Sequence, residues 1–478
     1  MKRIVSALIL SLSLAACSLA PVLKEPAMDV PAQYKELPPE ERGTWKTGQP
    51  AEVMPRGEWW KAFNDPLLNE LEAQAADANQ DLKAAAARVA EARALLGVAQ
   101  AERVPQVTAG FGPTRSKPSA VSQGLPNGID PPATTTWRGL LTASYEVDLF
   151  GRVADSINAA RGDYEASEAS FRSVTLALQA DVAQIYFALR ETDEELQLLR
   201  DTVKLREESV RLLQRRFDLG DISELDLARA KTELAVARND AIALERQRAQ
   251  LEHGLAVLLG RPPASFDLAT GPLATAMPSI PAGLPSSLLE RRPDITAAQR
   301  TMAAANARIG VAKSAFFPLL RLTGVAGFES SELGDLFKWS SRTWALGPLL
   351  GTILTLPLID GGRNQANLDR SYAVLEQSVA EYRQRVLVAF SEVEDSLAAL
   401  RTLAGQADAT RDAETSAARA LKIADARYKA GATNYLDVID AQRSLLSVQR
   451  LGTQIRGARA TSTVALIRAL GGGWGAPS

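Results

Sequence analysis

Residues 136–149 read TWRGLLTASYEVDL, a run in which apolar and polar side chains alternate. One face carries Trp137, Gly139, Leu141, Ala143, Tyr145, Val147 and Leu149, and the other carries Thr136, Arg138, Thr142, Ser144, Glu146 and Asp148, with Leu140 as the exception. This alternation predicts a β-strand with one apolar and one wet face, and its length suits a strand of a membrane barrel. A hairpin of a soluble protein would show the same pattern, so that interpretation stays open.

Three further strands are predicted. One lies upstream of residues 136–149, where polar residues or glycine alternate with Val107, Ala109 and Phe111. The Pro-, Gly- and Ser-rich stretch 112–135 is expected to be the loop that connects these two strands. Residues 319–329 and 343–358 have the same character in the second half of the chain.

Trp137 and Trp344 stand at corresponding strand starts, where a membrane barrel carries interfacial aromatic residues. Four strands cannot close a barrel, and lipid does not tolerate an open sheet edge, because its backbone groups would be unpaired. Three copies would supply twelve strands, an even number within the range of known barrels.

The chain contains a tandem repeat. It matches itself at a constant shift of 211 residues from about 148 to 260, placing Gly151-Arg152 on Gly362-Arg363, Gly220 on Gly431, Leu225-Asp226 on Leu436-Asp437 and Leu259-Gly260 on Leu470-Gly471. Upstream the shift is 213, which places Asp81 on Asp294, Gly97 on Gly310 and Pro105 on Pro318. A constant offset over so long a stretch indicates a duplication.

Each repeat is predicted to hold one helix before its strands and two long helices after them. Residues 80–103 are rich in alanine, which favours helix. Residues 152–219 and 363–430 lack proline, and each is long enough for a helix of about 100 Å. In the later helix, apolar residues spaced alternately by three and four predict a left-handed supercoil; they are Tyr372, Leu375, Val379, Tyr382, Val386, Ala389, Val393, Leu397 and Leu400.

A turn and a returning helix are expected after each long helix. Gly220 and Gly431 are predicted to end the long helices as left-handed C-caps. The returning helices open near Ser223 and Asn434. Asp148 and Asp360 are predicted to cap the long helices at their other end, with a structural role.

The first residues predict an exported lipoprotein. Lys2 and Arg3 precede a short apolar stretch, 4–14, that is too short to span a bilayer. The following Leu14-Ala15-Ala16-Cys17 resembles a bacterial lipobox, whose cysteine receives a diacylglycerol and an N-acyl chain such as palmitate. Cys17 is the only cysteine and cannot form an internal disulfide. Ser18 in place of aspartate favours the outer membrane, while an ordinary signal peptide with a chance cysteine is the alternative.

Composition excludes several classes of protein. Removal of Lys2 and Arg3 leaves 52 basic against 56 acidic residues, a net charge of −4, so nothing argues for nucleic-acid binding. His253 is the only histidine and is expected on a helix surface, which argues against metal sites and histidine-dependent triads. No later apolar run of about 18 residues predicts a transmembrane helix. We therefore expect no enzyme, no metal and no cofactor beyond the lipid on Cys17.

Four motifs resemble the outer-membrane factor family, in particular its OprM-like and NodT-like lipoprotein branch, with TolC a more distant relative. They are YEVDLFGR at 145–152, LPSSLLERRPDI at 284–295, LIDGGR at 358–363 and YKAGATNYLDVIDAQ at 428–442. With the lipobox they span almost the whole mature chain. The resemblance implies an α+β membrane protein, a homotrimer in which a twelve-stranded β-barrel with four strands per chain continues into a long α-helical barrel. It also implies a tripartite efflux pump, completed by a periplasmic adaptor and an inner-membrane transporter, often of the resistance-nodulation-division (RND) type.

The periplasmic aperture is expected at the tip of the second hairpin. Asp437 and Asp440 are three residues apart and share a helix face, so a trimer would bring six carboxylates near one axis and favour cations. The resemblance implies that these aspartates line the aperture and that Leu436 narrows it. It also implies that Tyr428 and Asp226 link neighbouring hairpins. A solvated helix-cap region is the alternative for the two aspartates.

Two details complete the prediction for the tips. Thr433 stands where TolC-like proteins carry an arginine, so opening is expected to depend less on salt links and more on the packing of Leu436. Gly220 and Gly431, with Leu219 and Ala430, are candidates for adaptor contact from their position and from the resemblance.

The predicted organisation follows the repeat. It comprises a signal peptide (1–16), an N-terminal extended segment (17–65), repeat 1 (66–260, strands near 105–149, hairpin 152–260), an equatorial linker (261–290), repeat 2 (291–470, strands near 318–358, hairpin 363–470) and a tail (471–478). The predicted function is a passive exit duct for drug-like or toxic small molecules in the outer membrane of a Gram-negative bacterium. A duct for type I protein secretion and a coiled-coil periplasmic lipoprotein without a channel are the alternatives.

Overall fold

The structure is a computed structural model that describes residues 18–24, 26–28, 31, 33–36, 57–126, 128–273, 278, 291–347 and 354–472. The predicted signal peptide and Cys17 lie outside the described residues. The chain divides into two compact units. Unit 1 comprises Met1–Pro26, Val89–Ser167 and Ala298–Tyr382, and unit 2 comprises Ala27–Arg88, Glu168–Ala297 and Arg383–Ser478. Each unit therefore takes segments from both repeats.

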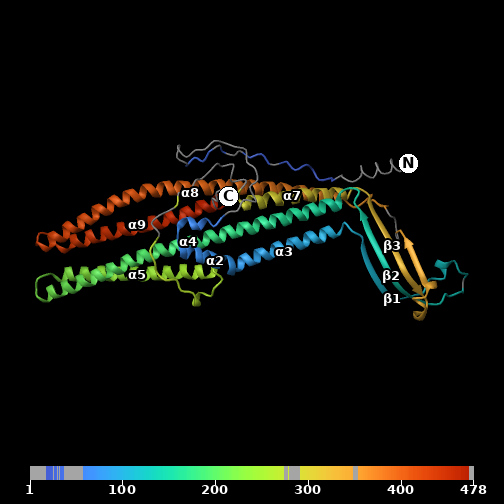
Figure 1. Cartoon of the computed structure of the whole chain (residues 1–478), viewed down its shortest axis with the longest axis horizontal. Helices are drawn as coiled ribbons and strands as arrows, with labels where there is room; N and C mark the ends of the chain where they lie inside the picture. Colours follow the sequence, from blue (N-terminus) through green and yellow to red (C-terminus); the bar gives the residue numbers. More distant parts are fainter. Residues whose placement is uncertain are drawn as a thin grey trace. The chain divides into compact units, whose positions relative to one another are not determined.

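The elements of the first repeat follow the predicted order (Figure 1). They are the short 3-10 helix η2 (Trp59–Phe63), α2 (Pro66–Ala78), α3 (Gln80–Ala101), β1 (Gln106–Ser116), η3 (Val121–Gln123), β2 (Thr134–Val147), α4 (Arg152–Asp218), α5 (Glu224–Leu258) and η4 (Pro263–Ser265). The predicted single helix before the strands is thus preceded by a second one, α2.

The second repeat has the same plan. Its elements are α7 (Pro293–Ser314), β3 (Leu319–Ser330), η5 (Leu333–Asp335), η6 (Trp339–Ser341), β4 (Arg342–Leu346), β5 (Leu354–Thr355), α8 (Arg363–Lys429) and α9 (Tyr435–Ala469). Helices α4 and α8 have 67 residues each, and α5 and α9 have 35 each. The equal lengths confirm the duplication.

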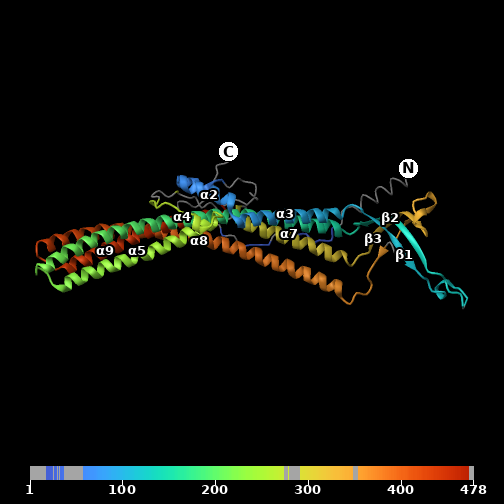
Figure 2. The same cartoon turned by 90° about the horizontal axis from the view of Figure 1, so that it is seen from below.

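In unit 1 the described strands form one antiparallel sheet in the order β1-β2-β3-β4, with β5 also paired to β3 (Figures 1 and 2). Leu141 on β2 lies opposite Ala109 on β1 and Ala326 on β3, and its neighbour Thr142 lies opposite Thr108 and Val325. The alternation predicted for 136–149 is therefore carried across the strands, so one face of the sheet is largely apolar.

Two strand boundaries differ from the prediction. Strand β1 continues through Pro113 to Ser116, so the expected loop at 112–135 is shorter, and Thr134 is already paired. Proline is tolerated there because β1 is an edge strand of this chain. The strand expected at 343–358 is present as β4 and β5, with residues 348–353 between them outside the described part of the chain.

The segment 17–65 was predicted to be extended, but its last residues form part of an aromatic core in unit 2. Trp59, Trp60 and Phe63 of η2 are buried, and the ring of Phe63 lies 4.8 Å from that of Phe187 on α4. Such rings bury large apolar areas, which is why this short segment folds onto the helix. The end of the N-terminal segment is therefore a packed element.

Both long helices begin as predicted, with an aspartate at the N-terminus. Asp148 Oδ2 accepts the backbone N–H of Ala154 at 2.8 Å, and Asp360 Oδ2 accepts that of Asn364 at 2.8 Å. These bonds satisfy N–H groups that have no partner inside the helix. The structural role assigned to both aspartates is confirmed.

None of the helices in the described residues is long and apolar enough to cross a membrane. His253 is exposed on α5, as expected, and the described residues contain no acidic, histidine or cysteine cluster suited to a metal ion.

Candidate functional site at the hairpin tips

The two helical hairpins of unit 2 turn through the predicted glycines. Gly220 has φ +78° and Gly431 has φ +72°, a left-handed conformation that glycine adopts without strain. The N–H of Gly220 donates to the carbonyl of Phe217 at 2.9 Å, and that of Gly431 donates to Tyr428 at 3.0 Å. Both C-caps are confirmed, and Ser223 and Asn434 then cap the returning helices α5 and α9.

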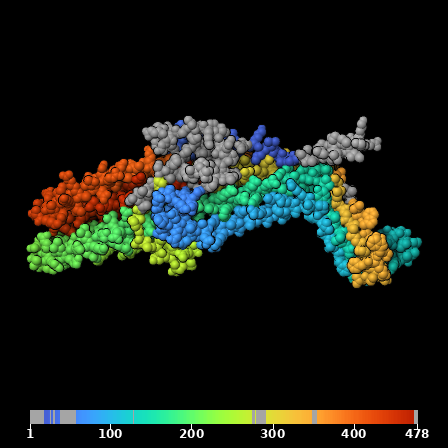
Figure 3. Space-filling view, in the orientation of Figure 1, coloured from blue at the N-terminus to red at the C-terminus, as the bar shows by residue number. Residues whose placement is uncertain are grey.

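The tips of the two hairpins pack against each other through one apolar cluster. Its buried members are Leu213, Leu227 and Ala230 of the first hairpin and Tyr435, Val438 and Ile439 of the second. In the space-filling view the red surface of the second tip adjoins the green surface of the first (Figure 3). The pair of tips is thus held by the chain's own core.

The first two turns of α9 separate two sets of side chains. Tyr435, Val438 and Ile439 face the apolar cluster, whereas Asp437 and Asp440 are exposed and Leu436 is half-buried. The three residues predicted for the aperture therefore lie on the face of α9 that this chain's own core leaves open.

The two aspartates have different partners. Asp437 accepts a hydrogen bond from the hydroxyl of Thr433, and its backbone N–H donates to Asn434 Oδ1 at 3.3 Å. Asp440 Oδ1 lies 3.5 Å from Arg443 Nη1, one turn further along α9. Asp437 is therefore exposed and also takes part in the cap of α9. Asp440 is exposed and lies close to the guanidinium of Arg443.

Tyr428 links the two hairpins, but through a residue that sequence reasoning missed. Arg216 near the end of α4 donates to the Tyr428 hydroxyl at 2.8 Å and lies 5.7 Å from the centre of its ring. The ring also lies 5.3 Å from that of Tyr435. Asp226 accepts a hydrogen bond at 2.9 Å from the hydroxyl of Ser223, the N-cap of α5, and its link to a neighbouring hairpin stays a prediction.

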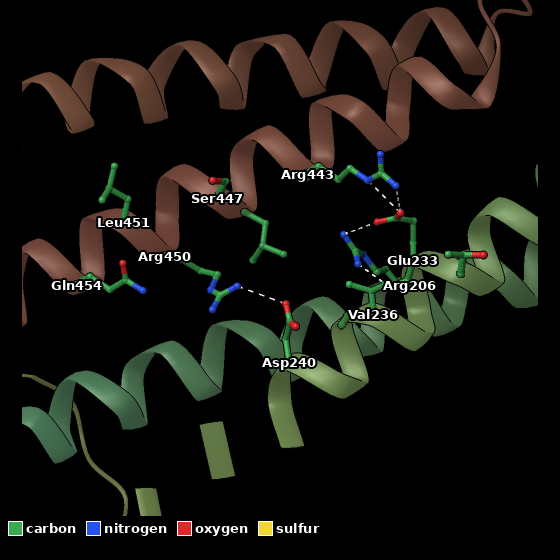
Figure 4. Close-up of a pocket in the computed structure, with 12 residues that line it drawn as sticks. Arg206, Glu233, Val236, Asp240, Arg443, Ser447, Arg450, Leu451 and Gln454 are labelled. Carbon is green, nitrogen blue, oxygen red and sulfur yellow. Dashed lines mark hydrogen bonds and ion pairs between the residues drawn. The ribbon is translucent and has the colours of Figure 1, made fainter. Parts of the chain in front are cut away.

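A second link between the hairpins surrounds Glu233 on α5. Arg443 Nε donates to Glu233 Oε1 at 3.0 Å, while Arg206 on α4 donates to the Glu233 carbonyl at 2.6 Å and lies 3.2 Å from Oε2 (Figure 4). Burial lowers the pKa of Arg206 and the charge of Glu233 opposes that shift. Salt links therefore join the two hairpins of one chain, and the expectation that opening depends mainly on the packing of Leu436 stays a prediction.

The Glu233 link lines a cavity of about 570 Å³ between α5 and α9. Further along this cavity, Arg450 lies 3.4 Å from Asp240 Oδ2 (Figure 4). Arg450 also donates to Glu195 Oε1 on α4 at 2.6 Å. A comparison of the repeats would have pointed to these residues, because Arg443 and Arg450 stand where the first repeat has Thr232 and Asn239.

The candidates for adaptor contact lie at the turns. Leu219 is 77% exposed although it is a large apolar residue, and Ala430 is also exposed beside its glycine. Their exposure suits a contact surface, and the contact itself stays a prediction. The lipidation site at Cys17 lies outside the described residues.

The chain is similar to known proteins over almost its full length. The profile of the outer membrane efflux protein family matches residues 71–261 and 284–472. The outer membrane protein OprJ of Pseudomonas aeruginosa is 36% identical over 473 residues, covering 98% of this chain and 96% of OprJ.

Solved structures agree with this. The CmeC outer membrane channel of Campylobacter jejuni has a TM-score of 0.87 at 27% identity, covering 96% of this chain and 95% of CmeC. The open state of the MtrE outer membrane channel of Neisseria gonorrhoeae has a TM-score of 0.80 at 31% identity, covering 96% of this chain and 98% of MtrE.

Proposed function

Since this chain belongs to the outer membrane efflux protein family, we propose that three copies of it assemble into the exit duct of a tripartite efflux pump. The chain is an outer-membrane channel component of an efflux system, as the resemblance in its motifs predicted. Its family is one of channels and not of enzymes.

The trimer is supported by the two open edges of the sheet. Strand β1 is one edge, and β4 with β5 forms the other. An edge in lipid leaves N–H and C=O groups unpaired at a cost of several kcal/mol each, so a membrane sheet has to close on itself. Pairing of β1 with β4 and β5 of the next copy would close the barrel and leave no free edge.

The partners and the anchor follow from the same proposal. An outer-membrane duct needs a periplasmic adaptor and an inner-membrane transporter, here of the RND type, to supply substrate and energy. The substrates are small drug-like or toxic molecules that pass through the duct passively. Each copy is held in addition by a diacylglycerol and an N-acyl chain on Cys17.

The aperture is proposed at the exposed face of α9. Asp437 and Asp440 place carboxylates there, and Leu436 lies beside them on the side that the apolar cluster leaves open. Around a threefold axis these charges would repel one another and stay hydrated, which favours cations in a narrow closed opening. Arg216 on Tyr428 and Arg443 on Glu233 hold the two hairpins of each copy behind this face.

The proposal is tested by single-channel recording of the purified protein in a planar bilayer. Wild type is expected to show a small cation-selective conductance. The variant Asp437→Ala/Asp440→Ala is expected to lose most of that selectivity and to conduct more. The matched control is Asp221→Ala/Glu224→Ala, which removes two exposed carboxylates from the other tip and is expected to behave like wild type.

The other outcomes are equally informative. A pore that is indifferent to loss of Asp437 and Asp440 keeps the duct but contradicts this aperture. If wild type and the Leu436→Ala variant both form well-folded trimers and neither conducts, the duct itself is contradicted.

A further inference from the structure

The first described residues of unit 1 lie on a buried carboxylate. The hydroxyl of Ser18 donates to Oδ1 of Asp155, on the first turn of α4, at 2.7 Å. The same hydroxyl oxygen accepts the backbone N–H of Ala20 at 3.2 Å. Asp155 is only 1% exposed, whereas Ser18 is exposed, so the bond joins a surface residue to a buried carboxylate. A buried acceptor of this kind stabilises the donor it holds.

Helix α7 provides the other side of this contact. The buried amide of Asn306 donates to the carbonyl of Pro21 at 2.8 Å, so a second polar side chain holds the segment three residues further on. Gly310, one turn later on α7, lies against the same residues. A β-carbon there would stand 2.0 Å from Asp155 Oδ2 and 2.8 Å from the backbone nitrogen of Ala20. Only a residue without a side chain fits that position.

The internal repeat shows that these features are specific to one position. Asp155 aligns with Ala366 at the shift of 211 residues, so α8 has no carboxylate at the equivalent place. Gly310 aligns with Gly97 on α3, where an added β-carbon would meet nothing within 4 Å. The duplicated scaffold therefore carries this pair of features once per chain, where residues 18–21 lie.

We propose that Asp155, Asn306 and Gly310 form a docking site for residues 18–21 of the same chain, which fixes the attachment point of the lipid anchor beside the start of α4. Neighbouring α-carbons are about 3.8 Å apart, so a lipid on residue 17 would be attached directly beside Ser18. Strand β2 ends at Val147 and α4 begins at Arg152, so this point adjoins the connection between sheet and helix. The docking rests on contacts of the described residues, and only its consequence for the lipid rests on the proposed anchor.

Hydrogen exchange read by mass spectrometry tests the site in the purified full-length trimer. The peptide covering residues 18–26 is expected to exchange slowly in wild type. Gly310→Ala is expected to raise its exchange rate at least about tenfold, because the segment has to leave the helix. Gly97→Ala, the repeat-related change without a steric conflict, is the control and is expected to match wild type. Ser18→Ala removes one hydroxyl without touching the helices and covers the case in which Gly310→Ala does not fold.

The mass of the N-terminal peptide reports acylation in the same experiment. Slow exchange in an unacylated chain would contradict the anchor and still support the docking site. Equal exchange in wild type, Gly310→Ala and Ser18→Ala would overturn the docking site whatever the state of Cys17.

Discussion

Glu72 on α2 is a buried acid without a counter-charge. It is 2% exposed, and neither of its carboxylate oxygens has a hydrogen-bond partner among the described residues. Burial raises the pKa of Glu72 from 4.5 to about 9, since the charged form loses its hydration. Glu72 is therefore protonated at neutral pH, a condition that no sequence pattern predicted.

Glu72 is expected to make stability fall as pH rises. The folded chain holds a proton that the unfolded chain releases above pH 4.5, so the stabilisation is complete below that pH and is lost towards pH 9. The free energy of unfolding should fall by about 1.4 kcal/mol per pH unit in this window. Urea denaturation of Glu72→Gln between pH 5 and 8 should lack this slope. The exposed neighbour Glu70→Gln should keep it, and a Glu72→Gln variant with the wild-type slope would contradict the assignment.

Helices α5 and α9 are held together by charges that differ between the repeats. Glu233 and Asp240 on α5 are seven residues apart, as are their partners Arg443 and Arg450 on α9. Residues seven apart lie on the same face of a helix. The two acids of α5 therefore face the two arginines of α9 along one seam, formed by the pairs Glu233–Arg443 and Asp240–Arg450. The seam distinguishes α5 from α9 even though the helices have equal lengths.

Loss of the Glu233 charge is expected to destabilise this pair of hairpins. Glu233→Gln leaves the buried Arg206 without its counter-ion, and breaking a buried pair costs about 3–5 kcal/mol. Ser444→Ala, the exposed repeat partner of Glu233, should change the free energy of unfolding by less than about 0.5 kcal/mol. Chemical denaturation of both variants measures this, and similar midpoints for the two would show that the link contributes nothing.

The apolar positions predicted for α8 face the core where the helix meets its own chain, whereas its left-handed supercoil stays a prediction. Val386, Ala389 and Val393 are fully buried at the predicted spacing. Tyr372 belongs to the same series of apolar residues but lies nearer the start of the helix, and its side chain is 43% exposed. In the proposed trimer that side chain would pack against a neighbouring copy.

In the proposed barrel, adjacent residues of a strand face different surroundings, one the lipid and the next the lumen. Leu141 lies on the apolar face of β2 and Thr142 on the opposite face, and each is paired with both neighbouring strands. In a closed barrel the apolar face meets lipid, where an arginine near the bilayer centre costs about 2–4 kcal/mol, whereas the lumen tolerates charge.

Leu141→Arg is accordingly expected to reduce the amount of trimer extracted from outer membranes, while Thr142→Arg inserts normally. Sizing of detergent-extracted protein from both variants gives the comparison. Equal yields would contradict the assignment of the apolar face to lipid.

Much of this protein was determined by local sequence. Period-two alternation predicted the strands, the absence of proline predicted the long helices, and the glycines Gly220 and Gly431 predicted the turns, because each depends on residues close together in the chain. The constant repeat shift predicted two similar halves. The four motifs then identified the family, and with it the outer-membrane location.

The contacts between distant segments were decided only by the tertiary structure. The link from Arg216 to Tyr428 joins residues 212 apart, that from Arg443 to Glu233 joins residues 210 apart, and that from Ser18 to Asp155 joins residues 137 apart. No periodicity in the sequence reports such pairs, because they depend on how whole helices pack and which faces meet. The same holds for Glu72, since its proton is held by the desolvation that packing imposes.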